Sequence, residues 1–138
     1  MKKFLVFLLI LPFITSCDEG SFNNRNPYIP NYTVSLPINL NLPQYSNLQF
    51  PSNHIVDYSQ GARGIVVFNT GSGFVAFDLA CPNQELSSCS TMTISGINAI
   101  CACDSAEYSL FSGQSAGLQY PMKQYRVEIQ GSMLTVYN

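Results

Sequence analysis

The clearest pattern in the chain is an alternation of apolar and polar residues that begins at Thr33. Polar residues and Pro37 alternate with apolar side chains at Val34, Leu36, Ile38, Leu40 and Leu42. A two-residue period places these apolar side chains on one face of a half-buried strand. Because Pro37 lacks the backbone N–H that a ladder needs, we expect this strand at the edge of a sheet.

Two pairs of β-branched and aromatic runs predict hairpins. Gly64–Phe68 and Phe74–Leu79 flank a turn with two glycines, and Gln124–Ile129 and Met133–Tyr137 flank a turn with one. No stretch has helical spacing with caps, so we expect an all-β fold, a small antiparallel sandwich or barrel. The Ser- and Gly-rich region 81–121 is expected to form loops carried by the sheet, where functional residues tend to lie.

The first sixteen residues have the features of an export signal. Lys2 and Lys3 precede an apolar run, Phe4–Ile14, about half as long as the ~20 residues that a helix needs to cross a bilayer. The run ends in Ile14–Cys17 (ITSC), which resembles the lipobox of bacterial lipoproteins. The resemblance implies that Cys17 is the lipidated first residue of a protein anchored to a membrane of the cell envelope, on its periplasmic face or at the cell surface. An ordinary signal peptide with a chance cysteine is the alternative.

Composition changes after the cysteine. Residues 18–31 are rich in Asp, Glu, Gly, Ser, Asn and Pro, which indicates a solvated tether. We therefore divide the chain into a signal peptide (1–16), a lipidated N-terminus with a flexible tether (17–31) and a β-domain (32–138). Residues 17–138 carry four basic and eight acidic side chains. They lack the clustered Lys and Arg that bind phosphates, so nucleic acid is not an expected partner.

Four cysteines remain once Cys17 is lipidated, namely Cys81, Cys89, Cys101 and Cys103. An even number in an oxidising compartment predicts two disulfides, with three possible connectivities. In an extended strand the Cα atoms of Cys101 and Cys103 stand about 7 Å apart, at the limit for a bridge, which favours pairing between the two loops. A zinc site is the alternative, but the gaps between these cysteines match zinc ligands poorly.

Other chemistry has weaker signals. A hydrolase needs a base near a nucleophile, and a single histidine limits the options. That histidine, His54, lies at an expected strand start and is interpreted as a surface or structural residue. Cys101–Cys103 (CAC) could exchange disulfides, but it lacks the spacing and helix N-terminus that activate such thiols. Asp104 and Glu107 could bind a cation, although such carboxylates are more often solvated. The sequence leaves open whether the protein is an enzyme, and it favours a protein without catalytic activity.

Two segments resemble those of a Rieske domain. Phe74–Asn83 (FVAFDLACPN) leads a strand into a cysteine where the family has Cys-x-His, and Ile100–Tyr108 (ICACDSAEY) stands where it has Cys-Pro-Cys-His-Gly-Ser-x-Phe. Gly113 resembles the glycine of the family's Asp-x-x-Thr-Gly, and Tyr120–Met122 its Gly-Pro-Ala loop. The resemblance implies a Rieske-like all-β domain over residues 32–138, with two cysteine-bearing loops.

The cluster ligands depart from the family's pattern. In Rieske proteins two cysteines hold one iron of a 2Fe-2S cluster and two histidines hold the other. Cys81 and Cys101 stand at the cysteine positions, but Asn83 and Asp104 stand at the histidine positions. An amide is a weak ligand for ferric iron, and a carboxylate would lower the reduction potential. We therefore expect no cofactor. The alternative is an electron-transfer protein whose 2Fe-2S cluster has unusual ligands, such as Asp104.

The resemblance also implies a disulfide pairing. Family members with an extra pair of cysteines bridge the two cluster loops at positions like those of Cys89 and Cys103. Cys81 and Cys101, whose counterparts hold the same iron, could then form a second bridge. Each bridge would stabilise the fold by about 3 kcal/mol in the chain-entropy model. We expect a membrane-anchored binding or structural protein of the envelope, whose protein or electron-transfer partner the sequence does not identify.

Overall fold

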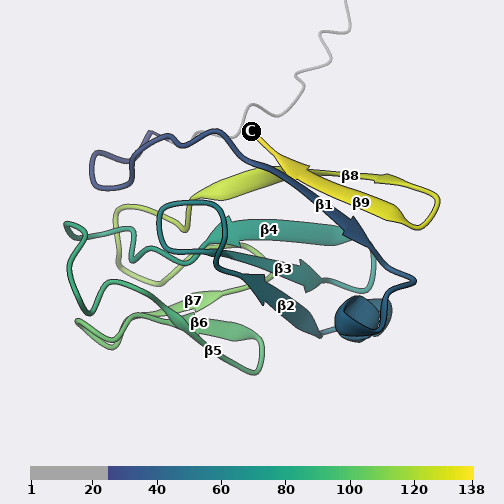
Figure 1. Ribbon diagram of the computed structural model, residues 1–138. Coiled ribbons are helices and arrows are strands. Elements are labelled where there is room, and N and C mark those ends of the chain that lie inside the picture. Colours follow the sequence, from purple (N-terminus) through teal and green to yellow (C-terminus); the bar gives the residue numbers. More distant parts are fainter. Residues whose placement is uncertain (1–24) are drawn as a thin grey trace, which may run out of the picture.

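Antiparallel strands make up the fold in the computed structural model, which describes residues 25–138 (Figure 1). Within that range the elements are, in chain order, β1 (Ser35–Asn39), the 3-10 helix η1 (Pro43–Gln49), β2 (His54–Asp57), β3 (Ile65–Asn69), β4 (Phe74–Asp78), β5 (Thr93–Ser95), β6 (Asn98–Ile100), β7 (Glu107–Ser109), β8 (Gln124–Gln130) and β9 (Met133–Tyr137). The prediction of an all-β fold is confirmed.

The expected signal peptide and Cys17 lie outside the described residues. None of the helical segments in residues 25–138 has the length and apolar character to cross a membrane.

A six-stranded sheet forms the frame of the molecule, in the order β1-β9-β8-β4-β3-β2. Both predicted hairpins are present, as β3–β4 and β8–β9. The first residues of β8 pair with β4, where Tyr125 lies opposite Ala76, and the rest of β8 pairs with β9. The sheet therefore curls along β8. Strand β1 lies at one edge, as Pro37 predicts, and β2 lies at the other.

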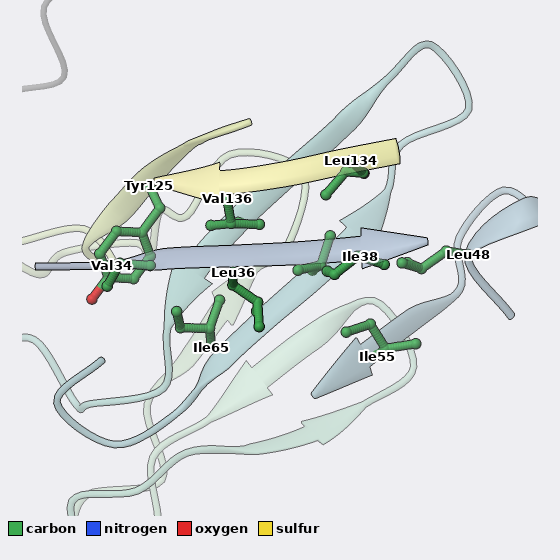
Figure 2. Packing of buried hydrophobic residues seen from close by; sticks show 11 residues of the cluster. Val34, Leu36, Ile38, Leu48, Ile55, Ile65, Tyr125, Leu134 and Val136 are labelled. Atoms are coloured by element: carbon green, nitrogen blue, oxygen red, sulfur yellow. The ribbon is translucent and has the colours of Figure 1, made fainter. Parts of the chain in front are cut away.

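Strand β3 is buried on both faces, which explains its unbroken apolar sequence. Ile65 and Val67 point into a first core, and Val66 and Phe68 point into a second one. The first core lies between β1, β8 and β9 on one side and β2–β4 on the other (Figure 2). Its buried members are Val34, Leu36, Ile38, Leu48, Ile55, Ile65, Val67, Ala76, Tyr125, Leu134 and Val136.

The second core lies between β3–β4 and a separate three-stranded sheet, in the order β5-β6-β7 (Figure 1). The interpretation of residues 81–121 as loops is wrong for these three strands. Each has three residues, too few for a period of two to be read, and each contributes one side chain to the second core: Ile94, Ala99 or Tyr108. Tertiary packing rather than local pattern therefore defines this sheet.

The first predicted strand ends earlier than its alternation indicates. Strand β1 stops at Asn39, whose carbonyl accepts a hydrogen bond from the Leu42 N–H at 3.0 Å, and this turn leads into η1. Leu42 is 43% exposed rather than buried. Leu48 of η1 fills the first core instead. The sequence does not predict η1, because this short helix buries one side chain and has no side-chain cap.

The described end of the expected tether lies against the domain. In residues 25–31, Ile29 is 4% exposed, and the side-chain amide of Asn26 donates a hydrogen bond to the Pro82 carbonyl at 2.7 Å. This segment therefore contacts the loop that follows β4. The remainder of the expected tether, residues 17–24, lies outside the described residues.

Candidate functional site

Two cysteine-bearing connections meet at one end of the second core. The first cysteine loop, residues 79–92, joins β4 to β5, and the second cysteine loop, residues 101–106, joins β6 to β7. Disulfides bind them together, Cys81 to Cys101 with 5.7 Å between the Cα atoms and Cys89 to Cys103 with 5.1 Å. These are the pairs that the resemblance to the Rieske family implies.

The two bridges differ in burial and lie next to each other. Cys81 and Cys101 form the inner bridge, and they are 1% and 0% exposed within the second core. Cys89 and Cys103 form the outer bridge, in which Cys89 is exposed and Cys103 is half-buried. The sulfurs of Cys81, Cys101 and Cys103 all lie within 4.8 Å of one another. Because a metal ligand must be a thiolate, these sulfurs are not metal donors while both bridges are closed.

The first cysteine loop is held by its own backbone and by a buried serine. The Cys81 N–H donates to the Ser90 carbonyl at 2.8 Å. The Ser90 hydroxyl accepts from the Ser87 N–H at 2.8 Å and donates to the Ser87 carbonyl at 2.9 Å. Arg63 donates to the same carbonyl at 2.9 Å. These contacts position Cys81 and Cys89 independently of the bridges to the second cysteine loop.

The second cysteine loop is a tight turn that Asp104 closes. The Ser105 N–H donates to the Cys101 carbonyl, and the Cys101 N–H donates to the Ala106 carbonyl, both at 2.9 Å. The exposed Asp104 carboxylate accepts from the Ala106 N–H at 3.0 Å. Glu107, its expected companion in a cation site, accepts from the Asn98 amide at 3.3 Å. Asp104 therefore has a structural use within its own turn.

Asn83, which the sequence resemblance compares with the first histidine of the Rieske family, clamps three segments together. Its side-chain N–H groups donate to the Tyr108 hydroxyl at 2.9 Å and to the Tyr120 carbonyl at 2.8 Å. Its Oδ1 accepts from the Tyr120 N–H at 2.9 Å. Burial raises the pKa of Tyr108, and the hydrogen bond from Asn83 opposes that rise. The amide thus ties the first cysteine loop to β7 and to the connection between β7 and β8.

The connection between β7 and β8 packs closely on the sheet at Gly113. The Gly113 N–H donates to the Ser109 carbonyl at 2.7 Å, and the Gly113 carbonyl accepts from the Met122 N–H at 2.8 Å. Gly113 has a φ of 71°, and a Cβ there would lie 2.7 Å from the Phe77 ring. A glycine is therefore required both for the backbone conformation and for space.

Asp78 is a structural residue at this site that the sequence reasoning missed. Its fully buried carboxylate accepts hydrogen bonds from the Ala62 and Arg63 N–H groups, the Ala80 N–H and the Tyr125 hydroxyl, at 2.6 to 3.1 Å. Burial is the main cause that raises the pKa of Tyr125, and Asp78 adds to it. This carboxylate fixes the end of β4 just before Cys81. The available signal was an acidic residue within an apolar strand.

His54 lies outside the cysteine loops. It begins the edge strand β2, where it pairs opposite Phe68 and is half-buried. Burial lowers its pKa below the ordinary value of 6.5. The structure therefore does not place the one histidine of the chain in either loop that carries the expected cluster positions.

A polar pocket lies beside the connection between β7 and β8. Its lining residues are Arg25, Asn26, Gln119, Tyr120, Pro121, Met122 and Lys123. The buried Lys123 ammonium donates to the Pro30 carbonyl at 2.9 Å and to the Asn31 side chain at 2.5 Å. Burial lowers the pKa of Lys123, and Asp78 opposes that effect. The pocket thus joins the N-terminal segment to the loop that Asn83 clamps.

The donors present do not fit a Rieske-type 2Fe-2S cluster. Such a cluster needs two thiolates on one iron, and Cys81 and Cys101 are bonded to each other. On the other iron, Asn83 would have to leave three hydrogen bonds, and Asp104 is exposed and closes its own turn. The arrangement supplies a doubly bridged pair of loops with a polar clamp.

No protein-family model and no curated protein matches the sequence. Solved structures with similarity include the complex of reduced oxygenase and oxidized ferredoxin in carbazole 1,9a-dioxygenase, at 20% identity over 63% of this chain and 82% of the other, with a TM-score of 0.46. The Sphingomonas yanoikuyae B1 ferredoxin is 15% identical over 64% of this chain and 88% of its own, with a TM-score of 0.45. The ferredoxin of carbazole 1,9a-dioxygenase from Nocardioides aromaticivorans IC177 is 14% identical over 64% and 86%, with a TM-score of 0.44.

Proposed function

We propose that this chain is a lipid-anchored protein of the bacterial cell envelope, whose Rieske-like β-domain is a binding or structural module with two disulfides in place of a 2Fe-2S cluster. One observation carries the proposal. By the resemblance to the Rieske family, Cys81 and Cys101 correspond to the cluster cysteines, and in the structure their sulfurs form a buried bridge. The loops that would hold a cluster are thereby stapled without iron.

Exposed apolar side chains next to the second core support a binding role. Phe111 is 44% exposed and packs edge-on against Phe68, with 5.0 Å between ring centroids. Ile97 is 45% exposed, and its carbonyl accepts a hydrogen bond from the Leu110 N–H, which brings the two segments together. Exposed aromatic and aliphatic groups of this kind are frequent at protein interfaces. They are a natural contact surface for a partner protein.

Iron content and thiol count test the loss of the cluster. We expect the full-length protein, purified anaerobically from the envelope, to be colourless, to contain iron far below one atom per chain and to show no reactive thiols until it is denatured and reduced. Reduction should then release four thiols, because the proposal assigns Cys17 to lipid. A brown protein with two irons per chain would overturn the proposal and establish the electron carrier instead.

The anchor is tested separately by fractionation. We expect the full-length chain in the membrane fraction and expect it to incorporate a radiolabelled fatty acid. The Cys17→Ser variant should lose the label, because it lacks the sulfur to which the lipid is attached. A wild-type chain that stays unlabelled and outside the membrane fraction would refute the anchor while leaving the disulfide argument intact.

A further inference from the structure

The two bridges are arranged so that one is reachable from outside and the other is shielded. Cys89 of the outer bridge is exposed, whereas Cys81 and Cys101 of the inner bridge are 1% and 0% exposed. A dithiol in solution must contact a sulfur to reduce it, so access favours attack on the outer bridge. The sulfur of Cys103 connects the two, because it lies within 4.8 Å of both inner sulfurs.

We propose that the bridges form a thiol–disulfide exchange relay that accepts reducing equivalents from an exported dithiol. Reduction of the outer bridge frees Cys103, and the Cys103 thiolate then attacks the inner bridge at Cys81. The proposal rests on the two disulfides of the proposed function, and it adds an activity and a substrate class to them.

Cys103 is the sulfur that can carry the exchange. Only Cys103 of the outer bridge belongs to the group of described sulfurs that lie within 4.8 Å of one another. The Ser87 hydroxyl lies 3.4 Å from the Cys89 sulfur and 3.6 Å from the Cys103 sulfur. A hydroxyl placed there can donate a hydrogen bond to the thiolate that reduction produces. Opening of the outer bridge therefore yields a nucleophile beside its target.

A hydrogen bond determines which inner sulfur leaves. The Gln84 amide lies 2.8 Å from the Cys101 sulfur, to which its N–H donates. In disulfide exchange the leaving sulfur takes on negative charge, and a donor that stabilises this charge speeds departure. Attack at Cys81 makes Cys101 the leaving group and uses this donor. The product is a Cys81–Cys103 bridge with a thiol at Cys101.

The electrons and protons balance at each step. The external dithiol gives two electrons and two protons to the Cys89–Cys103 bond and becomes a disulfide, which leaves thiols on Cys89 and Cys103. Cys103 then loses its proton, bonds to Cys81 and breaks the Cys81–Cys101 bond, and Cys101 takes up one proton. The second step is an isomerisation with no net redox change. After this step the free thiol is on the buried Cys101, and Cys81 is bonded to the half-buried Cys103.

Two full-length variants test the relay without an added reductant. Cys89→Ser leaves Cys103 as the odd thiol, and the matched Cys103→Ser leaves Cys89, which is not among the clustered sulfurs. Each purified protein is denatured at mildly acidic pH, which suppresses further exchange by keeping thiols protonated, and is alkylated with a maleimide so that buried thiols are also labelled. It is then mapped by tandem fragmentation of tryptic peptide 64–123, which holds all four cysteines. In Cys89→Ser we expect label at Cys101 together with a Cys81–Cys103 bridge. Label at Cys101 should be at least about tenfold higher than in Cys103→Ser, which should be labelled at Cys89 alone.

The outcomes separate the relay from the function on which it rests. If the wild type maps to both bridges and Cys89→Ser is labelled at Cys103 alone, the relay is refuted and the disulfide-stapled domain stands. If the wild type contains iron or four free thiols, both fall. Equal labelling of Cys101 in the two variants also refutes the relay, because exchange would then not depend on the position of Cys103.

The role of Gln84 is tested in the Cys89→Ser background. Gln84→Met keeps the length of the side chain and removes the N–H donor. We expect the ratio of label at Cys101 to label at Cys81 to fall severalfold, because the Cys101 thiolate loses its stabilising donor and attack at Cys101, which frees Cys81, becomes competitive. An unchanged ratio would show that Gln84 does not select the leaving sulfur.

Discussion

The two cores of this protein are built in different ways. The first core joins strands of four to seven residues and the side chain of η1, and its buried members include no cysteine. The second core rests on three strands of three residues each, and both inner-bridge cysteines are among its members. Where strands are long, alternating apolar side chains suffice to close a layer. Where they are short, covalent bridges and polar clamps such as Asn83 hold the loops in place.

The cores share one layer, since β3 contributes side chains to both. The first core therefore supports the second, because the sheet β5–β7 has the other face of β3 and β4 as its packing surface. The reverse dependence is weaker, because β1, β8 and β9 contact each other and β4 without the cysteine loops. Damage to the first core should spread, and damage to the second should stay local.

Leu134→Ala should produce the largest loss of stability. Leu134 of β9 is fully buried and pairs opposite Ile38 and Ile129. We expect a cost of about 4 kcal/mol in the free energy of unfolding, measured by urea denaturation, because the truncation leaves a cavity in the first core. Hydrogen exchange should show lost protection in both cores. Ile129→Ala is the control, since Ile129 is 50% exposed and should cost far less. Full protection of β5–β7 in Leu134→Ala would contradict the shared-layer argument.

Removal of the inner bridge should have a smaller and local effect. The double variant Cys81→Ala with Cys101→Ala loses a bridge with a sequence separation of 20, worth about 3 kcal/mol in the chain-entropy model. Amide protection should fall in β5–β7 and persist in β8 and β9. Cys89→Ala with Cys103→Ala is the matched control, with a separation of 14 and an exposed member. If the loss of protection spread evenly over both cores, the stapling of the second core alone would be disproved.

Asn83→Ala tests the polar clamp and should cost about 2 kcal/mol, because it leaves the Tyr120 backbone and the Tyr108 hydroxyl without their partner. The pKa of Tyr108 should rise further above its ordinary value, since the hydrogen bond from Asn83 lowers it. A pH titration of the assigned Tyr108 ring carbon by NMR measures this shift apart from the other seven tyrosines. Asn83→Asp, which keeps the acceptor for the Tyr120 N–H, should retain more stability than Asn83→Ala. A Tyr108 pKa that stays unchanged in Asn83→Ala would exclude the clamp.

Sequence predicts the first core far better than the second. The alternation from Val34 to Ile38 and the two hairpins each contain enough residues for a period of two to be read, so the strands and the edge position of β1 follow from local pattern. The strands β5–β7 have no such pattern, and their packing depends on contacts with β3 and β4. The pairing of the four cysteines could be predicted from the resemblance to a family. The clamp of Asn83 and the buried role of Asp78 could not be predicted, because all their hydrogen-bond partners except the Ala80 N–H lie 15 to 47 residues away.

The smallest expected effect is a pH dependence from His54, on the edge strand β2 that contributes Ile55 to the first core and Val56 to the second. Burial lowers the pKa of His54 below 6.5, so the unfolded chain binds a proton more readily than the folded one. Stability should therefore be highest above pH 6.5 and should fall as the pH drops through 6.5 toward the folded pKa. His54→Gln should reduce the change of the thermal unfolding midpoint between pH 7.5 and pH 5.5. This range lies above the ordinary carboxylate pKa values, so carboxylates contribute little to the change. Because β2 adjoins both cores, thermal unfolding followed by tyrosine fluorescence and by hydrogen exchange in β5–β7 should report the same small slope. A wild-type midpoint that rises on acidification would mean that His54 gains a stabilising partner when charged, contrary to its burial.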